Sequence, residues 1–89
     1  MKKKIGILGS TGSIGNNTVQ IIKNNKKDFD VNFLSTNNNV KKLINQCVEL
    51  KPKSVIIFNE RKYFQYKKYF ISKKIKVFSS FKDLKKKNT

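Results

Sequence analysis

The segment Gly9-Ser-Thr-Gly-Ser-Ile-Gly15 decides how the fold of this chain is interpreted. It follows a short apolar run at residues 4–9, which predicts a buried strand that ends in glycine. A helical pattern begins directly after the segment. The helix is expected to bury one face, formed by Ile14, Thr18, Ile21 and Ile22. A strand, a glycine-rich turn and a helix in this order are typical of the phosphate-binding turn in a dinucleotide-binding domain.

The three glycines of the segment suit three different tasks in such a turn. Gly9 lets the chain leave the strand sharply, Gly12 removes a Cβ where a pyrophosphate must approach, and Gly15 lets the helix pack closely. Backbone amides near the helix start would then face the anion, supported by the helix dipole. We therefore predict cofactor contacts from Thr11, Gly12, Ser13 and Ile14. Because the spacing is G-x-x-G-x-x-G and not G-x-G-x-x-G, a tight turn without a ligand is the alternative.

The rest of the chain alternates strand and helix patterns. Further strands are expected at residues 30–35, 54–58 and 75–78, and further helices from Val40 to the residues before Pro52 and at 60–72. Val31 and Phe33 are expected on one side of the second strand, and Ser80 to Asp83 form a capping box for a last short helix. This order predicts the α/β class: a single domain over residues 1–89 with a Rossmann-like open parallel sheet of about four strands and flanking helices.

The end of the second predicted strand carries no carboxylate. Sites that prefer NAD usually place an Asp or Glu there to hold the ribose 2′-hydroxyl. This chain has Asn37, Asn38 and Asn39 instead, with Lys41 and Lys42 nearby. A 2′-phosphate would meet polar donors and cations, which favours NADP over NAD. An ordinary polar loop is the alternative interpretation.

The charge of the chain is extreme, with 21 Lys+Arg against 5 Asp+Glu and a formal net charge of +16. Such a balance favours a small basic nucleic-acid-binding protein as an alternative function. The composition has a simpler explanation, because 20 Lys and 11 Asn stand beside one Arg and no Ala, as expected from an A/T-rich genome. Dedicated nucleic-acid binders favour Arg. We therefore expect nucleic acid to bind only nonspecifically and in a salt-sensitive way.

Other classes of function are excluded by the residues that are rare or missing. The chain has no His and a single cysteine, Cys47, so Ser-His-Asp catalysis, Cys-His catalysis and an internal disulfide are ruled out. Cys47 falls on the apolar stripe of its predicted helix, which indicates a core residue. No apolar run approaches the roughly 20 residues that cross a bilayer. We therefore expect no membrane association and a reducing, cytoplasmic location.

A family resemblance emerges from these residues together. The nonapeptide Ile7 to Gly15, then Asn39-Val40, Leu43, Gln46, and Pro52 ahead of an apolar strand, resemble the N-terminus of the 1-deoxy-D-xylulose 5-phosphate reductoisomerase family. The match covers roughly residues 4–60 and continues loosely to the end. It implies the NADPH-binding N-terminal part of an oxidoreductase of non-mevalonate isoprenoid biosynthesis. That family forms 2-C-methyl-D-erythritol 4-phosphate, using NADPH and a divalent metal (Mg or Mn).

The resemblance also implies the cofactor contacts by position. They are Thr11, Gly12, Ser13, Ile14, Asn37, Asn38 and Asn39. The family usually has Gly-Lys-Asn at the last three positions, so Asn39 matches whereas Asn37 and Asn38 depart. The departure at Asn38 removes a lysine that would favour NADP, and a degenerate remnant that binds nothing is therefore a further alternative.

Length is the larger departure, because the family's proteins are several times longer. The family's metal-binding carboxylates, substrate-phosphate site and catalytic loop all lie beyond residue 89. We therefore expect a truncated domain fragment without the catalytic and C-terminal domains, inactive on its own, whose first strand forms an unpaired sheet edge. The partners considered are NADPH, a separate catalytic half and a second copy of the chain.

Overall fold

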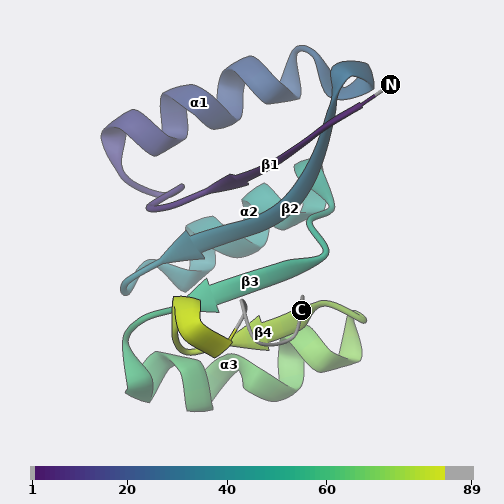
Figure 1. Cartoon of the computed structure of the whole chain (residues 1–89). Coiled ribbons are helices and arrows are strands. Elements are labelled where there is room, and N and C mark those ends of the chain that lie inside the picture. Colours follow the sequence, from purple (N-terminus) through teal and green to yellow (C-terminus); the bar gives the residue numbers. More distant parts are fainter. Residues whose placement is uncertain (1, 84–89) are drawn as a thin grey trace.

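The computed structural model describes residues 2–83, which form a parallel sheet with helices packed against it (Figure 1). The strands are β1 (Lys3–Ile7), β2 (Phe29–Thr36), β3 (Ser54–Ile57) and β4 (Lys76–Phe78). The helices are α1 (Ser13–Lys23), α2 (Val40–Leu50) and α3 (Glu60–Ser72), with a 3₁₀ turn, η1 (Lys26–Asp28), between α1 and β2. The predicted α/β alternation and the parallel sheet are confirmed, with only small differences at the ends of elements.

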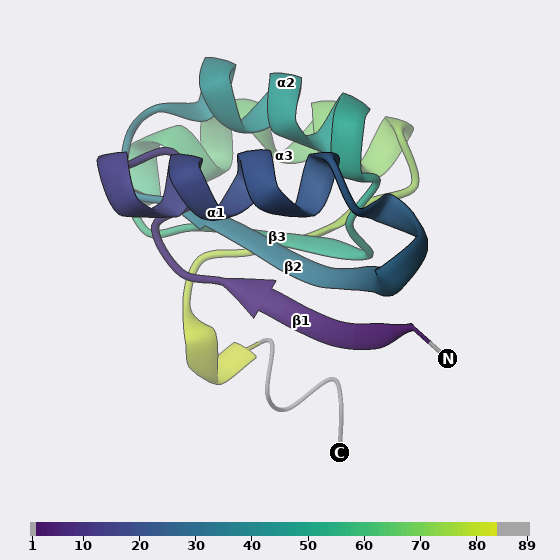
Figure 2. The same cartoon turned by 90° about the horizontal axis from the view of Figure 1, so that it is seen from above.

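The strands lie in the sheet in the order of the sequence, β1-β2-β3-β4. Each strand is therefore added on the same side of the one before it. Because crossovers between parallel strands are right-handed, the helices of all these crossovers lie on the same face of the sheet. Figure 2 shows α1, α2 and α3 together on one face, with residues 79–83 after β4 on the other. That segment begins as expected, because the Ser80 hydroxyl accepts a hydrogen bond from the Asp83 amide at 3.3 Å. The rest of the expected helix lies outside the described residues.

The main core fills the space between the three helices and the sheet. Its fully buried side chains come from β2, β3 and the inner faces of α2 and α3: Leu34, Val40, Leu43, Val55, Ile57 and Phe70. Cys47 belongs to this core, as the sequence predicted. The α2 helix ends before Pro52, where Lys51 adopts a left-handed conformation with φ of 50°.

The buried face of α1 differs from the expected one. Gly15, Val19 and Ile22 are buried, whereas Ile14 is 84% exposed and Ile21 is 60% exposed. Positions 15, 19 and 22 share one side of a helix, and this side lies about 100° around the axis from the position of Ile14. The close approach permitted by Gly15 sets this rotation. The prediction from apolar periodicity was therefore wrong for Ile14 and Ile21 and correct for Ile22.

The second strand also differs, because Val31 and Phe33 do not share a side. The pairing of β1 with β2 shifts register between Ile5 and Gly6, whose partners are Val31 and Phe33, so β2 has one extra residue at this point. Such an insertion changes the alternation of side chains. Val31 therefore joins the main core, whereas Phe33 packs with Ile56 and Phe78 in a second cluster.

Two further contacts define the second cluster. The rings of Phe33 and Phe81 meet edge to face, with centroids 5.7 Å apart. Gly6 leaves the space that the Phe33 ring occupies, because a Cβ at position 6 would overlap that ring.

The first strand lies at the edge of the sheet. Within residues 2–83, β1 pairs only with β2, which confirms the expected unpaired edge. Lys3 and Lys4 are exposed on this strand. Charged side chains on an edge strand oppose pairing with another sheet.

Candidate functional site

The turn after β1 is built around its glycines. Gly9 has a φ of +65°, a conformation that side chains rarely adopt. The amide of Gly12 donates to the carbonyl of Gly9 at 3.0 Å and closes the turn. A Cβ on Gly15 would overlap the Gly9 carbonyl oxygen, so α1 lies directly against the turn. Gly9 and Gly15 therefore have the structural roles that the sequence predicted.

The end of β2 supports this turn from one side. The amide of Gly9 donates to the Ser35 hydroxyl at 2.7 Å, and the amide of Ser10 donates to the Ser35 carbonyl at 2.9 Å. The Ser35 hydroxyl in turn donates to the carbonyl of Ile7 at 3.2 Å. Thr11 and Thr36 share a hydrogen bond between their hydroxyls at 2.7 Å. The turn is thus fixed to its neighbouring strand by buried and partly buried polar contacts.

Helix α2 supports the turn from a second side. Gln46 donates to the carbonyl of Ser10 at 2.8 Å, and the Lys42 ammonium donates to the carbonyl of Thr11 at 3.2 Å. The two side chains are four residues apart and therefore lie on the same face of α2. In a trans peptide the carbonyl and the following amide point in opposite directions. Because Gln46 holds the Ser10 carbonyl, the Thr11 amide faces away from α2.

The amides at the start of α1 are open to a ligand. Among residues 2–83, no acceptor is recorded for the amides of Thr11, Ser13 and Ile14. Gly12 differs from the expectation, because its amide is engaged by the Gly9 carbonyl. Gly12 is exposed, and a Cβ there would meet only that carbonyl oxygen, at 3.4 Å. Gly12 can therefore contribute space for an anion, and the other three residues can contribute donors.

A hollow of about 530 Å³ lies over these groups. Leu8, Gly12 and Ile14 are among the residues that line it. Leu8 is 63% exposed, so the hollow has an apolar side next to the polar amides. This combination suits a ligand that has both an anionic group and an apolar ring.

The second predicted group, Asn37 to Asn39, forms the turn after β2 and is exposed. Asn39 caps α2, since its side chain accepts from the Lys42 amide at 3.2 Å. Asn38 accepts from the Asn59 side chain at 2.6 Å, and the carbonyl of Asn37 accepts from the Asn59 amide at 3.1 Å. Because β1 and β2 are parallel neighbours, both turns lie at the same edge of the sheet. All seven predicted contact residues are therefore placed along this edge.

Two residues hold the site together in a role that the sequence did not predict: Ser35, and Gln46, which the sequence indicated only as part of the family resemblance. Both are buried, and their polar atoms bond the backbone of the glycine turn. Gln46 could have been found from its position beside Cys47 on the buried side of α2, where a polar side chain needs a partner. Within residues 2–83, the Gln46 oxygen Oε1 is buried and has no hydrogen-bond partner.

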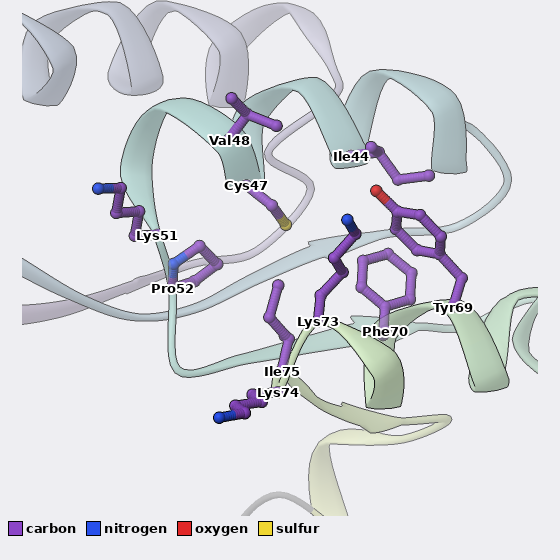
Figure 3. A pocket seen from close by; sticks show the side chains of 10 residues that line it. All are labelled: Ile44, Cys47, Val48, Lys51, Pro52, Tyr69, Phe70, Lys73, Lys74 and Ile75. Atoms are coloured by element: carbon purple, nitrogen blue, oxygen red, sulfur yellow. The ribbon is translucent and has the colours of Figure 1, made fainter.

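A different hollow, of about 430 Å³, lies between the ends of α2 and α3 (Figure 3). Its walls include Ile44, Cys47 and Phe70, and Lys51 and Lys73 also line it. It adjoins the amino ends of β3 and β4, at the opposite edge of the sheet from the glycine turn. Burial raises the pKa of the Cys47 thiol to about 12, so the thiol stays protonated and is no nucleophile at neutral pH.

Metal-binding clusters and membrane-spanning helices are both absent from residues 2–83. This part of the chain contains no group of three or more His, Cys, Asp or Glu side chains that could hold a metal ion. It also contains no helix that is long and apolar enough to span a membrane.

A glycine turn with open amides, at the carboxyl edge of a parallel sheet and at the start of a helix, defines a Rossmann-like domain of the dinucleotide-binding class. Comparison with known families makes the assignment specific. The family model for 1-deoxy-D-xylulose 5-phosphate reductoisomerase matches residues 5–87, and the chain belongs to this family.

Named relatives and solved structures agree with this assignment. The reductoisomerase of Porphyromonas gingivalis is 56% identical over 63 residues, covering 71% of this chain and 16% of the relative. That of Pelagibacter ubique is 42% identical over 84 residues, covering 94% and 22%. The structure of the Zymomonas mobilis enzyme in complex with NADPH superposes with a TM-score of 0.81 and 27% identity, covering 88% of this chain and 21% of that one.

A second structure, of a reductoisomerase in complex with NADPH, fosmidomycin and magnesium, superposes with a TM-score of 0.82 and 25% identity. It covers 92% of this chain and 20% of that one. The chain thus spans about a fifth of the length of the relatives that it matches.

Proposed function

We propose that these residues form the NADPH-binding N-terminal portion of a 1-deoxy-D-xylulose 5-phosphate reductoisomerase. The whole enzyme would convert 1-deoxy-D-xylulose 5-phosphate to 2-C-methyl-D-erythritol 4-phosphate in non-mevalonate isoprenoid biosynthesis. The single observation that carries the proposal is the turn after β1, whose open amides lie beside an exposed Gly12. The family match over residues 5–87 supports it.

The residues of the turn fit a dinucleotide. The amides of Thr11, Ser13 and Ile14 would donate to the pyrophosphate, and the positive end of the α1 dipole would favour its charge. Gly12 would let the phosphates approach the backbone. Asn37, Asn38 and Asn39 would surround the ribose nearest the adenine, at the end of β2. NADPH supplies a hydride when it is bound, and this part of the chain would fix its position.

The chemical step would require residues outside this segment. The divalent metal used by the family has no fitting ligand group in residues 2–83. We therefore propose that the segment alone is inactive, and that the metal and substrate sites come from a catalytic part, on the same polypeptide or on a separate one. The lone cysteine, which has no partner for a disulfide within the chain, supports a reducing compartment such as the cytoplasm.

Nonspecific binding to polyanions is the second candidate function, and the net charge of +16 favours it. The two candidates make different demands on the molecule. Polyanion binding needs only surface lysines, whereas NADPH binding needs the shape of the glycine turn.

The substitution Gly12→Val separates the two functions. The chain is titrated with NADPH, and binding is followed by the nicotinamide fluorescence. We expect saturable binding by the wild-type chain and none by Gly12→Val, because the added side chain fills the path of the pyrophosphate. Circular dichroism should show an intact fold, because a Cβ at position 12 meets one atom at 3.4 Å.

A single-stranded DNA oligonucleotide serves as the control ligand. Its binding should be the same for both chains and should fall by orders of magnitude between about 50 and 200 mM salt. A folded Gly12→Val variant that binds NADPH as the wild type does would contradict the proposed function. DNA binding that resists salt and is lost with Gly12→Val would favour a specific nucleic-acid site.

A further inference from the structure

Lys42 links the two turns that form the candidate site. It is the third residue of α2, and its backbone amide donates to the capping side chain of Asn39. Its side chain extends to the glycine turn, where the ammonium group donates to the carbonyl of Thr11. One residue thus contacts the turn after β2 through its backbone and the turn after β1 through its ammonium group.

The position between these turns is where a dinucleotide fold places the ribose that carries the adenine. NADPH differs from NADH by a phosphate on the 2′-oxygen of that ribose. An ammonium group has three donors, and the Thr11 carbonyl uses one of them. Two donors of Lys42 therefore remain for a phosphate at this position.

The charge of Lys42 is also available. The ion pairs recorded within residues 2–83 join Lys23 and Lys26 to Glu49, and Lys53 to Asp30. Lys42 takes part in none of them. It is partly buried against the turn, so solvent screens its charge less than that of an exposed lysine.

We propose that Lys42 determines the preference for NADPH over NADH by binding the 2′-phosphate, in place of a lysine in the turn after β2. This inference rests on the proposed function. Asn38 stands where the family usually has lysine, and its side chain is hydrogen-bonded to Asn59 and carries no charge. Lys42 supplies from the helix the cation that the turn lacks.

Lys41 provides a matched control for this proposal. It precedes Lys42 in the same turn of α2, but it is exposed and has no recorded contact with the glycine turn. Removing its charge changes the net charge of the chain by the same amount. A difference in cofactor affinity between the two variants therefore reflects the position of the lysine and not the total charge of the chain.

The experiment measures the Kd of the 89-residue chain for NADPH and for NADH at low salt, for the wild type and for Lys42→Gln, Lys42→Arg and Lys41→Gln. Lys42→Gln should weaken NADPH binding by about tenfold more than it weakens NADH binding, as expected for one charge-assisted hydrogen bond to the 2′-phosphate, because the lost contact with the Thr11 carbonyl affects both cofactors alike. Lys42→Arg should retain most of the NADPH affinity. Lys41→Gln should change the affinities for NADPH and NADH only slightly, and by less than the loss of NADPH affinity in Lys42→Gln. Thermal unfolding followed by circular dichroism confirms that the variants are folded.

The outcomes separate this inference from the proposed function. Equal weakening of NADPH and NADH by Lys42→Gln would overturn the inference, because Lys42 would then only support the turn. A wild-type chain that binds NADPH and NADH equally, with both lost in Gly12→Val, would also overturn it while the proposed function stands. Failure of the folded wild-type chain to bind either cofactor would overturn both.

Discussion

The turn after β1 and the turn after β2 lie side by side, yet they are held in different ways. The first turn is held by buried side chains of two elements: its Gly9 amide donates to the Ser35 hydroxyl on β2, and its Ser10 carbonyl accepts from Gln46 on α2. The second consists of Asn37, Asn38 and Asn39, all exposed, and its contacts involve Asn59 and the first turn of α2. Buried contacts thus fix the shape of the first turn, whereas exposed hydrogen bonds at the surface hold the side chains of Asn38 and Asn39 in the second.

This difference predicts where the chain tolerates substitution. A change in the turn after β1 disturbs buried hydrogen bonds. Asn37 and Asn38 are exposed, so a change of their side chains disturbs only surface contacts. The first turn would therefore provide the general affinity for a dinucleotide, and Lys42 on α2, beside the second turn, would set the choice between cofactors.

The largest effect that would test this comparison is expected from Gly15→Val. The new side chain would overlap the Gly9 carbonyl and separate α1 from the turn, which should cost about 3 kcal/mol or more in the free energy of unfolding. Chemical denaturation followed by circular dichroism measures the loss. Gly12→Val introduces the same side chain three residues earlier and should leave the stability nearly unchanged. Equal stabilities of the two variants would show that the glycine turn is not fixed by close packing.

A smaller effect is expected from Ser35→Ala. The hydroxyl accepts from the Gly9 amide and donates to the Ile7 carbonyl, so its loss leaves a donor of the turn unpaired and should cost about 2 kcal/mol. Ser54→Ala is the matched control, because Ser54 is buried on the next strand and makes one recorded side-chain bond, to the carbonyl of Asn32. Urea denaturation should rank Ser35→Ala as the less stable variant. The reverse order would mean that β2 does not support the turn.

The smallest effect should come from Asn39→Ala in the second turn. The variant loses the side chain that caps α2, and caps of this kind contribute about 1 kcal/mol. Asn45→Ala, on an exposed position within α2, should be neutral or slightly stabilising. The shift in melting temperature between the two variants measures the cap. A loss as large as that of Ser35→Ala would remove the distinction between the turns.

The sequence predicted the order of elements well, because the apolar runs that become β1 and β3 are short and bounded by Gly or Pro. It also located both turns, since glycine spacing and the position after a strand are local signals. It failed for α1, where close packing at Gly15, and not the distribution of isoleucines, sets the buried face. It failed for β2 because one extra residue in the strand places Val31 and Phe33 on opposite sides of the sheet. Periodicity cannot reveal such an insertion.

The support of the glycine turn by α2 was hidden for a different reason. Gln46 and Ser10 are 36 residues apart, and their contact depends on how α2 packs on the face of the sheet beside α1. A single sequence does not specify such a contact. The sequence did place Lys41 and Lys42 near the cofactor, but only the structure distinguishes them, because one side chain turns toward Thr11 and the other toward solvent.

The space shared by Gly6 and Phe33 has a consequence for how this family of sequences can diverge. Any larger residue at position 6 collides with the ring, so it can be accepted only after the aromatic residue at position 33 has become smaller. The two sites are therefore expected to change as a pair among descendants of a common ancestor. Each exchange on its own would leave either a clash or an unfilled gap beneath the strands.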